Sequence, residues 1–319
     1  MTRLSLFWEW LRKNISTVMP IVVSIVIIGV FQLINPTFLS YQGIITLIYT
    51  SSYFLVAACG LTFVIMMGSF DFSVISLLKL SAIICVLYID KIGFMVIPVA
   101  LLVCVGFGFI SGLLFARFKV PSFMVTLGIS IVVEGIALYL SKGFLNIMYN
   151  KAFMAIATTF IAGLPSILYW AVGTWIVCTF IAIRMPFGRR TYSIGGNPVA
   201  AGLSGINIER HRIYVFMLSG FLSGLAGILY MAQMGGGSTN IGVNMTIPLF
   251  ASVVAGGTAL TGGVGGPHRT LLGVIIITWI QAGLLMAGIG SNIQFVVVGL
   301  IAIVMSIATI DRRRTKIIK

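Results

Sequence analysis

The sequence predicts an all-α polytopic membrane protein, and three observations carry this prediction. Hydrophobic residues make up 59% of the 319 residues, whereas charged residues make up only 8%. The apolar residues gather in runs that are long enough to cross the hydrocarbon core of a bilayer. Basic residues lie mainly at the ends of these runs, which is how membrane proteins fix their orientation. The net charge of +14 therefore reports topology, and neither a soluble domain nor binding to nucleic acid is expected.

About ten apolar runs are candidate transmembrane helices, and together they predict a single transmembrane domain over residues 1–319. In chain order the runs are 17–34, 44–67, 73–89, 93–115, 122–141, 165–183, 213–233, 246–263, 271–287 and 292–310. The first run follows a basic segment without a small-residue cleavage pattern, so we expect it to be kept as a span. All four cysteines lie within apolar runs, and we expect them to be core residues rather than disulfide partners or metal ligands.

The basic residues predict that both termini lie in the cytoplasm. If the N-terminus is cytoplasmic, sixteen of the twenty basic residues fall on that side. Lys91, Lys142 and Lys151 fall outside, and Lys79 lies within a span. Such a bias is typical of the positive-inside rule, and it places the protein in a cell membrane as a multi-pass chain. The segment 144–165 is then the main extracytoplasmic surface.

Short or broken helices are expected at two places, near residues 68–73 and 246–266. The first joins two spans with almost no room for an aqueous loop. The second is short and rich in glycine, and could be a hairpin that returns to the same face. That hairpin would move the basic C-terminal tail outside, so a broken helix that still crosses the membrane fits the charge pattern better. Irregular backbone at this depth must be buried in protein or line a cavity.

Polar side chains inside the apolar runs are the candidate substrate-pathway residues. They are Asp71, Ser73, Glu134, Thr258 and Gln281. Asp71 either lines the pathway or caps a broken helix beside Ser73, because a carboxylate in lipid needs a partner or water. Glu134 faces either a polar solute or a hydrogen-bonded site inside the bundle. For Thr258 and Gln281 the alternative is a structural role in helix packing.

Lys79 follows Asp71 by eight residues on the same predicted helix. That spacing places them about 12 Å apart along the axis, too far for a direct ion pair.

The polar loop 185–212 is the candidate docking surface for a partner. Glycines at 195, 196, 202 and 205 permit tight turns, and Asn197 and Pro198 are typical of the start of a short helix over 197–203. The alternative is an ordinary basic cytoplasmic loop. The residues that would carry the contact are Gly195, Gly196, Asn197, Ala200, Ala201, Gly202, Leu203, Ser204 and Gly205.

Four sequence blocks resemble the permease subunits of bacterial ATP-binding-cassette sugar importers, the family of ribose, arabinose, xylose, galactose and autoinducer permeases. The resemblance runs from the second span to the tail. The blocks are GSFDFSVISLLKLSA (68–82), VPSFMVTLGISIVVEGIALYL (120–140), SIGGNPVAAGLSGINIERHRI (193–213) and VVAGGTALTGGVGG (253–266). In the first block Ser69, Phe70, Phe72 and Ile75 replace the usual glycines and aliphatic residues of the family.

The resemblance implies a function and a set of partners. The loop 185–212 resembles the coupling helix that fits a groove of a separate ATPase subunit, which would bind ATP and Mg. A second permease subunit, identical or similar, and an extracytoplasmic substrate-binding protein are implied too. Segment 144–165 lacks the Gly-Arg-Pro-type motif of many members. The implied cargo is a small hydroxylated solute such as a monosaccharide, and the implied location is the bacterial inner membrane.

No catalytic triad and no phosphate-binding loop ending in Lys-Ser or Lys-Thr occurs in the sequence, so we expect a transport subunit without a cofactor of its own. Two alternatives stay open. One is an ion-coupled secondary transporter in which Asp71, Glu134 and Lys79 bind protons or cations. The other is an importer of the same class for nucleosides. Permeases for branched-chain amino acids share parts of the same sequence pattern and are a further competitor within the class.

Overall fold

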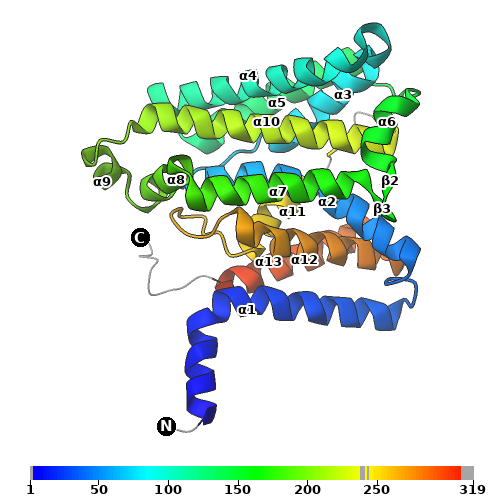
Figure 1. Cartoon of the computed structure of the whole chain (residues 1–319). Coiled ribbons are helices and arrows are strands. Elements are labelled where there is room, and N and C mark those ends of the chain that lie inside the picture. Colours follow the sequence, from blue (N-terminus) through cyan, green and yellow to red (C-terminus); the bar gives the residue numbers. More distant parts are fainter. Residues whose placement is uncertain (1–2, 238–240, 243, 310–319) are drawn as a thin grey trace.

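The computed structural model describes residues 3–237, 241–242 and 244–309. This part of the chain is a bundle of long helices that run along a common axis (Figure 1). Each of the ten apolar runs has a helix in the structure. These helices are α1 (Arg3–Ile34), α2 (Tyr41–Met66), α3 (Val74–Ile92), α4 (Val96–Arg117), α5 (Ser122–Ser141), α7 (Ser166–Arg184), α10 (Ile208–Met234), α11 (Thr246–Ala255), α12 (Pro267–Met286) and α13 (Ser291–Thr309).

The remaining elements are short and lie between these helices. They are η1 (Gly93–Met95), α6 (Lys151–Thr158), α8 (Pro186–Gly196), α9 (Pro198–Leu203), β1 (Asn146–Ile147), β2 (Phe160–Ile161), β3 (Leu164–Pro165) and β4 (Gly236–Gly237). Strand β1 pairs antiparallel with β4, and β2 pairs antiparallel with β3.

Six segments of the described residues are long and apolar enough to cross a membrane. One of them, Val74–Arg117, joins α3 and α4 through η1 and therefore holds two helices. Met19–Ile34, Thr246–Ala255 and Asn292–Ile301 are apolar but shorter. The structure thus establishes a helical membrane protein, while the number of about ten crossings and the side of the termini stay predictions.

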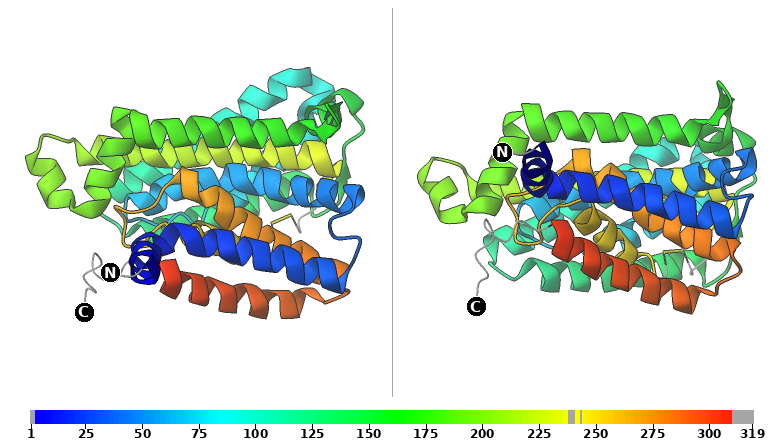
Figure 2. Two further views of the ribbon diagram at one scale, coloured as in Figure 1. Left: turned by 60° about the horizontal axis from the view of Figure 1, so that its bottom comes forward. Right: turned by 90° about the horizontal axis from the view of Figure 1, so that it is seen from below.

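The two ends of the bundle differ in their elements and in their charge. Helices α8 and α9 form one end, together with the C-terminal ends of α4 and α7 (Figure 1). The basic residues of 184–212 belong to that end. The opposite end holds α6, β2 and β3, and the first and last helices have their outer ends on the α8 side (Figure 2). The basic loop 184–212 therefore lies at the same end of the bundle as the outer ends of the first and last helices, and the side of the membrane on which this end lies stays a prediction.

Helix α2 forms the centre of the bundle, since nearly all of its residues from Ser52 to Met66 are buried. It lies in the larger of two buried apolar clusters, together with α3 and α10. The second cluster joins α1, α12 and α13 through Phe31, Phe38 and Trp279. All four cysteines are buried and carry free thiols.

Small residues bring α10 very close to α3 and α4. A Cβ atom on Gly220 would lie 2.4 Å from the carbonyl oxygen of Cys104, and one on Gly227 would lie 2.1 Å from that of Leu78. These contacts leave no room for a side chain, so the backbones pack directly. Burial of this kind places α10 beside the start of α3, where the polar site described below is formed.

Both predicted helix interruptions are present. Helix α2 ends at Met66 and α3 begins only at Val74, while α11 ends at Ala255 and α12 begins at Pro267. Gly68 has a φ of 76°, and five of the glycines between 257 and 266 also have positive φ. Residues with side chains rarely adopt this conformation, which explains why glycine occupies the two turns.

Candidate functional site

The predicted docking loop folds into two short helices at the end of the bundle. Helix α8 begins at Pro186, whose fixed φ suits the first turn. Helix α9 begins after Asn197, whose Oδ1 accepts a hydrogen bond from the backbone N–H of Ala200 at 3.1 Å. The short helix expected over 197–203 is therefore observed, capped as the sequence indicates. Helix α8 was not expected, because its three glycines and two arginines interrupt the apolar spacing that is typical of a helix.

Helix α9 projects beyond the ends of the long helices, at the left of Figure 1, and both views of Figure 2 show the same projection. Val199 and Leu203 are 71% and 86% exposed, although both are apolar. Ala201 faces inward and is buried. The chain turns back at Gly205, which has a φ of 81° and thereby ends the helix. Helix α9 thus presents two exposed apolar side chains on a short helix with a defined start and end, which is suited to fill a groove in another protein.

The end of α8 lies directly against both helix interruptions. A Cβ atom on Gly195 would lie 1.9 Å from the carbonyl oxygen of Met66 and 2.6 Å from the backbone nitrogen of Gly263. The backbone N–H of Gly263 donates to the carbonyl of Met66 at 2.8 Å. Three backbone segments therefore meet without side chains between them. A displacement of α8 would act on the end of α2 and on the turn before α12 at the same time.

Two further hydrogen bonds fix the glycine-rich turn between α11 and α12. The phenol of Tyr192 on α8 donates to the carbonyl of Gly265 at 2.6 Å. Burial raises the pKa of Tyr192, so the phenol keeps the proton that it donates. Thr258 is buried, and its Oγ1 accepts a hydrogen bond from the N–H of Gly266 at 3.1 Å. Thr258 thus closes the turn, and its contact with a solute stays a prediction.

Asp71 lies between the start of α3 and the middle of α10. Its Oδ1 accepts hydrogen bonds from the backbone N–H and the hydroxyl of Ser73, at 3.0 and 2.6 Å. The hydroxyl of Ser219 on α10 donates to the other oxygen at 2.7 Å. Asp71 is only 2% exposed. These contacts hold Asp71 against Ser73, the N-cap residue of α3, and they join this end of α3 to α10. A role of Asp71 in the substrate pathway stays a prediction.

Hydroxyl groups of α5 hold the loop that precedes α3. The backbone N–H of Phe70 donates to the Ser122 hydroxyl, and that of Phe72 donates to the Thr126 hydroxyl, each at 3.1 Å. The rings of Phe70 and Phe72 pack against Phe250 of α11. The two helix interruptions are thus connected to each other and to α5, and the backbone groups of this irregular loop find side-chain partners.

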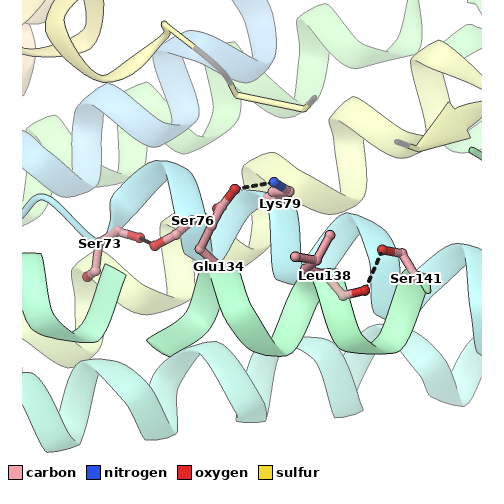
Figure 3. A network of polar contacts seen from close by, with 6 residues as sticks. All are labelled: Ser73, Ser76, Lys79, Glu134, Leu138 and Ser141. Carbon is pink, nitrogen blue, oxygen red and sulfur yellow. Dashed lines mark hydrogen bonds and ion pairs between the residues drawn. The ribbon is translucent and has the colours of Figure 1, made fainter. Parts of the chain in front are cut away.

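Lys79 and Glu134 form an ion pair between α3 and α5 (Figure 3). The Lys79 side chain is 2% exposed, whereas the Glu134 side chain is 51% exposed. Ser76, one turn before Lys79, donates to the carbonyl of Ser73 at 2.9 Å (Figure 3). The pair places one charge inside the bundle and presents the other on the outer face of α5. A carboxylate at this depth is costly in contact with lipid, so this face requires a protein or water environment.

Gln281 contributes to a cavity of about 300 Å³ between α2, α12 and α13. Thr46, Thr50 and Thr278 supply hydroxyl groups to its wall, and Asn244 and Gln294 supply two further amides. Tyr53, Phe54 and Phe295 supply aromatic surface. The size is at the lower end of the range for small-molecule sites, which begins at about 300 Å³. Such walls can exchange hydrogen bonds with hydroxyl groups and stack against an apolar ring face.

The predicted pathway residues do not converge on one site. Asp71 and Ser73 touch each other, whereas Glu134, Thr258 and Gln281 each lie in a separate cluster. Sequence reasoning missed Ser219 and Tyr192, which hold Asp71 and the glycine-rich turn. Their only signal was a hydroxyl within an apolar run or beside a glycine pair. The roles of all these residues in transport stay predictions.

Comparisons with known proteins find a matching family and relatives that cover most of the chain, including the site described above. The family described as the branched-chain amino acid transport system / permease component matches residues 43–306. A ribose import permease protein of Haemophilus influenzae is 34% identical over 292 residues, which are 89% of this chain and 90% of that protein.

Two further relatives are similar over comparable lengths. A ribose import permease protein of Bacillus subtilis is 31% identical, with 91% of each chain covered. The L-arabinose transport system permease protein of Escherichia coli is 29% identical, covering 88% of this chain and 84% of that protein. No solved structure matches this chain.

Proposed function

The chain belongs to the family of permease components described for branched-chain amino acid transport systems, and we propose that it is the membrane subunit of an ATP-binding-cassette importer. Its proposed cargo is a small hydroxylated solute of the monosaccharide class, which enters the cytoplasm when a separate ATPase subunit hydrolyses ATP with Mg. Relatives that carry ribose and arabinose in their names support this class of cargo.

The contact of Gly195 with Met66 and Gly263 is the observation that carries the proposal. Helix α9 presents Val199 and Leu203 to solvent, and α8 connects it rigidly to two interruptions inside the bundle. A movement of a partner bound to α9 can therefore be transmitted through α8 to the two helix interruptions, with no flexible loop between them. An ion-coupled transporter acting alone would have no use for this arrangement.

The cavity around Gln281 supports the proposed class of solute. Its hydroxyl and amide groups offer both donors and acceptors, and no charged side chain is among its lining residues. A sugar or a nucleoside fits this chemistry, whereas a branched-chain amino acid would carry two charges into a neutral wall. We therefore favour a hydroxylated, uncharged solute over an amino acid.

A second permease subunit, identical or similar, would cover the outer face of α5. This face carries Glu134 at its centre and the apolar residues Leu127, Ile131 and Leu138 along the same stripe. Packing two such faces together, or enclosing a wet path between them, would remove the half-exposed carboxylate from lipid. The soluble substrate-binding protein would dock at the opposite end from α9, where Phe144 and Tyr149 are exposed beside α6.

Affinity co-purification of the full chain in mild detergent from its native cells tests this function. Mass spectrometry of the bound proteins should recover an ATPase subunit, and a second permease species would indicate a heterodimer. Repeated recovery of the chain alone, in several detergents, would contradict the proposal and favour the ion-coupled transporter.

A further inference from the structure

A basic cavity lies between α8 and the first turns of α10. It measures about 660 Å³, and the side chains of Arg189, Arg190 and Arg210 line it together with Ser193, Asn207 and Tyr214. No carboxylate among the described residues lies within 4 Å of these three arginines. Glu209, the acid of this segment, is not part of the wall. Three guanidinium groups around one cavity repel each other, and an anion between them would relieve that repulsion.

A second cavity lies farther along α10, between this helix and α7. It measures about 640 Å³, and its wall comes from α7 and α10, which run parallel to each other in Figure 1. Its wall is almost wholly apolar, with Trp170, Val177 and Ile181 from α7 facing Leu218, Phe221 and Leu225 from α10. Val177 is 56% exposed and Phe221 is 38% exposed, so the groove is open to its surroundings.

One face of α10 connects the two cavities. Arg210 and Tyr214 line the basic cavity, and Leu218, Phe221 and Leu225 line the apolar groove. The spacings of four, four, three and four residues keep all five on one side of a helix. Arg210 and Leu218 lie about 12 Å apart along the axis. The two cavities thus follow one another along one side of α10, as a path that runs from a cationic end past Tyr214 to an apolar groove.

We propose that this path binds an anionic phospholipid, with the phosphate among the arginines and an acyl chain in the groove between α7 and α10. Arginine matches phosphate through paired hydrogen bonds, and basic sites at the cytoplasmic surface attract anionic headgroups. A free phosphate ion or an acidic side chain of a partner protein would fill only the basic cavity. The apolar groove that follows it favours a lipid.

Lipid binding to the purified full chain tests the proposal without an ATPase or a solute, so it is independent of the proposed function. Phosphatidylglycerol and phosphatidylcholine are added stepwise in detergent, and bound lipid is counted by native mass spectrometry. We expect phosphatidylglycerol to bind the natural chain about tenfold more tightly than phosphatidylcholine. Glycerol phosphate, which has the anionic group without the chains, should bind far more weakly.

Two matched pairs of variants locate the site. Arg189→Gln with Arg210→Gln should weaken phosphatidylglycerol binding about tenfold, whereas Arg117→Gln with Lys119→Gln removes the same charge elsewhere and should leave it unchanged. Gly173 lines the groove and has open space where a Cβ would lie, so Gly173→Trp should block the acyl chain. Gly106 on α4 has equally open space, and Gly106→Trp is its control.

Three results would overturn the proposal. One is equal phosphatidylglycerol binding by the two charge variants. Another is binding of glycerol phosphate as tight as that of the lipid, which would assign the cavity to a soluble anion. The third is an arginine variant that keeps the lipid but loses the ATPase subunit in co-purification, which would assign the cavity to a protein partner.

Discussion

Gly195 on α8 touches Met66 at the end of α2 so closely that a Cβ atom would lie 1.9 Å from the Met66 carbonyl oxygen. A Cβ atom on the neighbouring Gly196 would have no other atom within 4 Å. The two adjacent glycines thus differ in the space that is available to a side chain. Substitutions at Gly195 therefore test the contact inside the permease, and substitutions at Gly196 test the proposed contact with a partner, because each glycine can be replaced without the other.

Gly195→Ala should lower solute uptake at least tenfold, because backbone must move to admit the methyl group. Overpacking of this kind costs about 1–3 kcal/mol and displaces the end of α8 from both helix interruptions. Uptake into proteoliposomes that contain the assembled complex measures the effect. Gly196→Ala is the matched control and should transport normally. Equal uptake by the two variants would show that the contact with Met66 does not transmit motion.

Gly196→Trp should prevent recovery of the ATPase subunit while leaving the permease folded. A Cβ atom on Gly196 meets no other atom within 4 Å, and the indole attached to it would project beside α9 into the space that a docked partner needs. Co-purification measures binding, and melting in detergent reports the fold. If Gly196→Trp and Gly196→Ala retain the ATPase equally, the docking surface lies elsewhere.

Leu203→Asp should weaken binding of the ATPase subunit without changing the stability of the chain. Leu203 is 86% exposed, so its replacement removes apolar contact area only in the complex. Loss of one buried leucine at an interface amounts to about 1.5–3 kcal/mol, or at least a tenfold weaker dissociation constant. Phe144→Asp, at a residue 70% exposed at the opposite end of the bundle, is the control. A similar loss of binding in both variants would argue against α9 as the contact.

Asp71→Ala should lower the free energy of unfolding by about 2–4 kcal/mol, because the two serines lose a charged acceptor. Ser219→Ala removes a single one of these bonds and should cost about 1–3 kcal/mol. Denaturation in mixed micelles measures both. Asp90→Ala removes an exposed carboxylate from the other end of α3 and should change stability by no more than about 0.5 kcal/mol. Unchanged stability of Asp71→Ala, with uptake lost, would instead make Asp71 a pathway residue.

Gln281→Leu should reduce uptake of the solute while the ATPase subunit still binds. The substitution keeps the approximate size of the side chain and removes a donor and an acceptor from the cavity wall, where a lost hydrogen bond costs about 0.5–1.5 kcal/mol. Gln42→Leu, outside the cavity on α2, is the control. The cavity would lose its proposed role if both variants transport the solute at the natural rate.

The helices and their interruptions could be predicted because both are local properties of the sequence. Apolar runs of sufficient length mark the helices, and the glycines around 257–266 mark a turn that other residues cannot adopt. The cap at Asn197 was predictable for the same reason. Helix α8 escaped prediction since its side chains are stabilised by contact with α2 and α10 rather than by their own pattern.

The side-chain clusters could not be predicted, because they depend on how the helices rotate against each other. Lys79 and Glu134 are 55 positions apart, and Asp71 and Ser219 are 148 positions apart. Nothing in the sequence distinguishes Ser219 from the other hydroxyl residues of α10. The close approach of α10 to α3 and α4 brings these partners together, and that approach depends on glycines whose contacts lie far along the chain.

The burial of all four cysteines makes the natural chain a ready background for spectroscopy. Thiol reagents should react slowly with it, so a single cysteine placed at Leu203 would carry a label at a known, exposed point of α9. Two such labels, one on each permease of an assembled complex, would report the separation of the two α9 helices through the ATP cycle. A label separation that changes during the cycle would show that α9 moves, and a constant separation would show that α9 is a fixed docking surface.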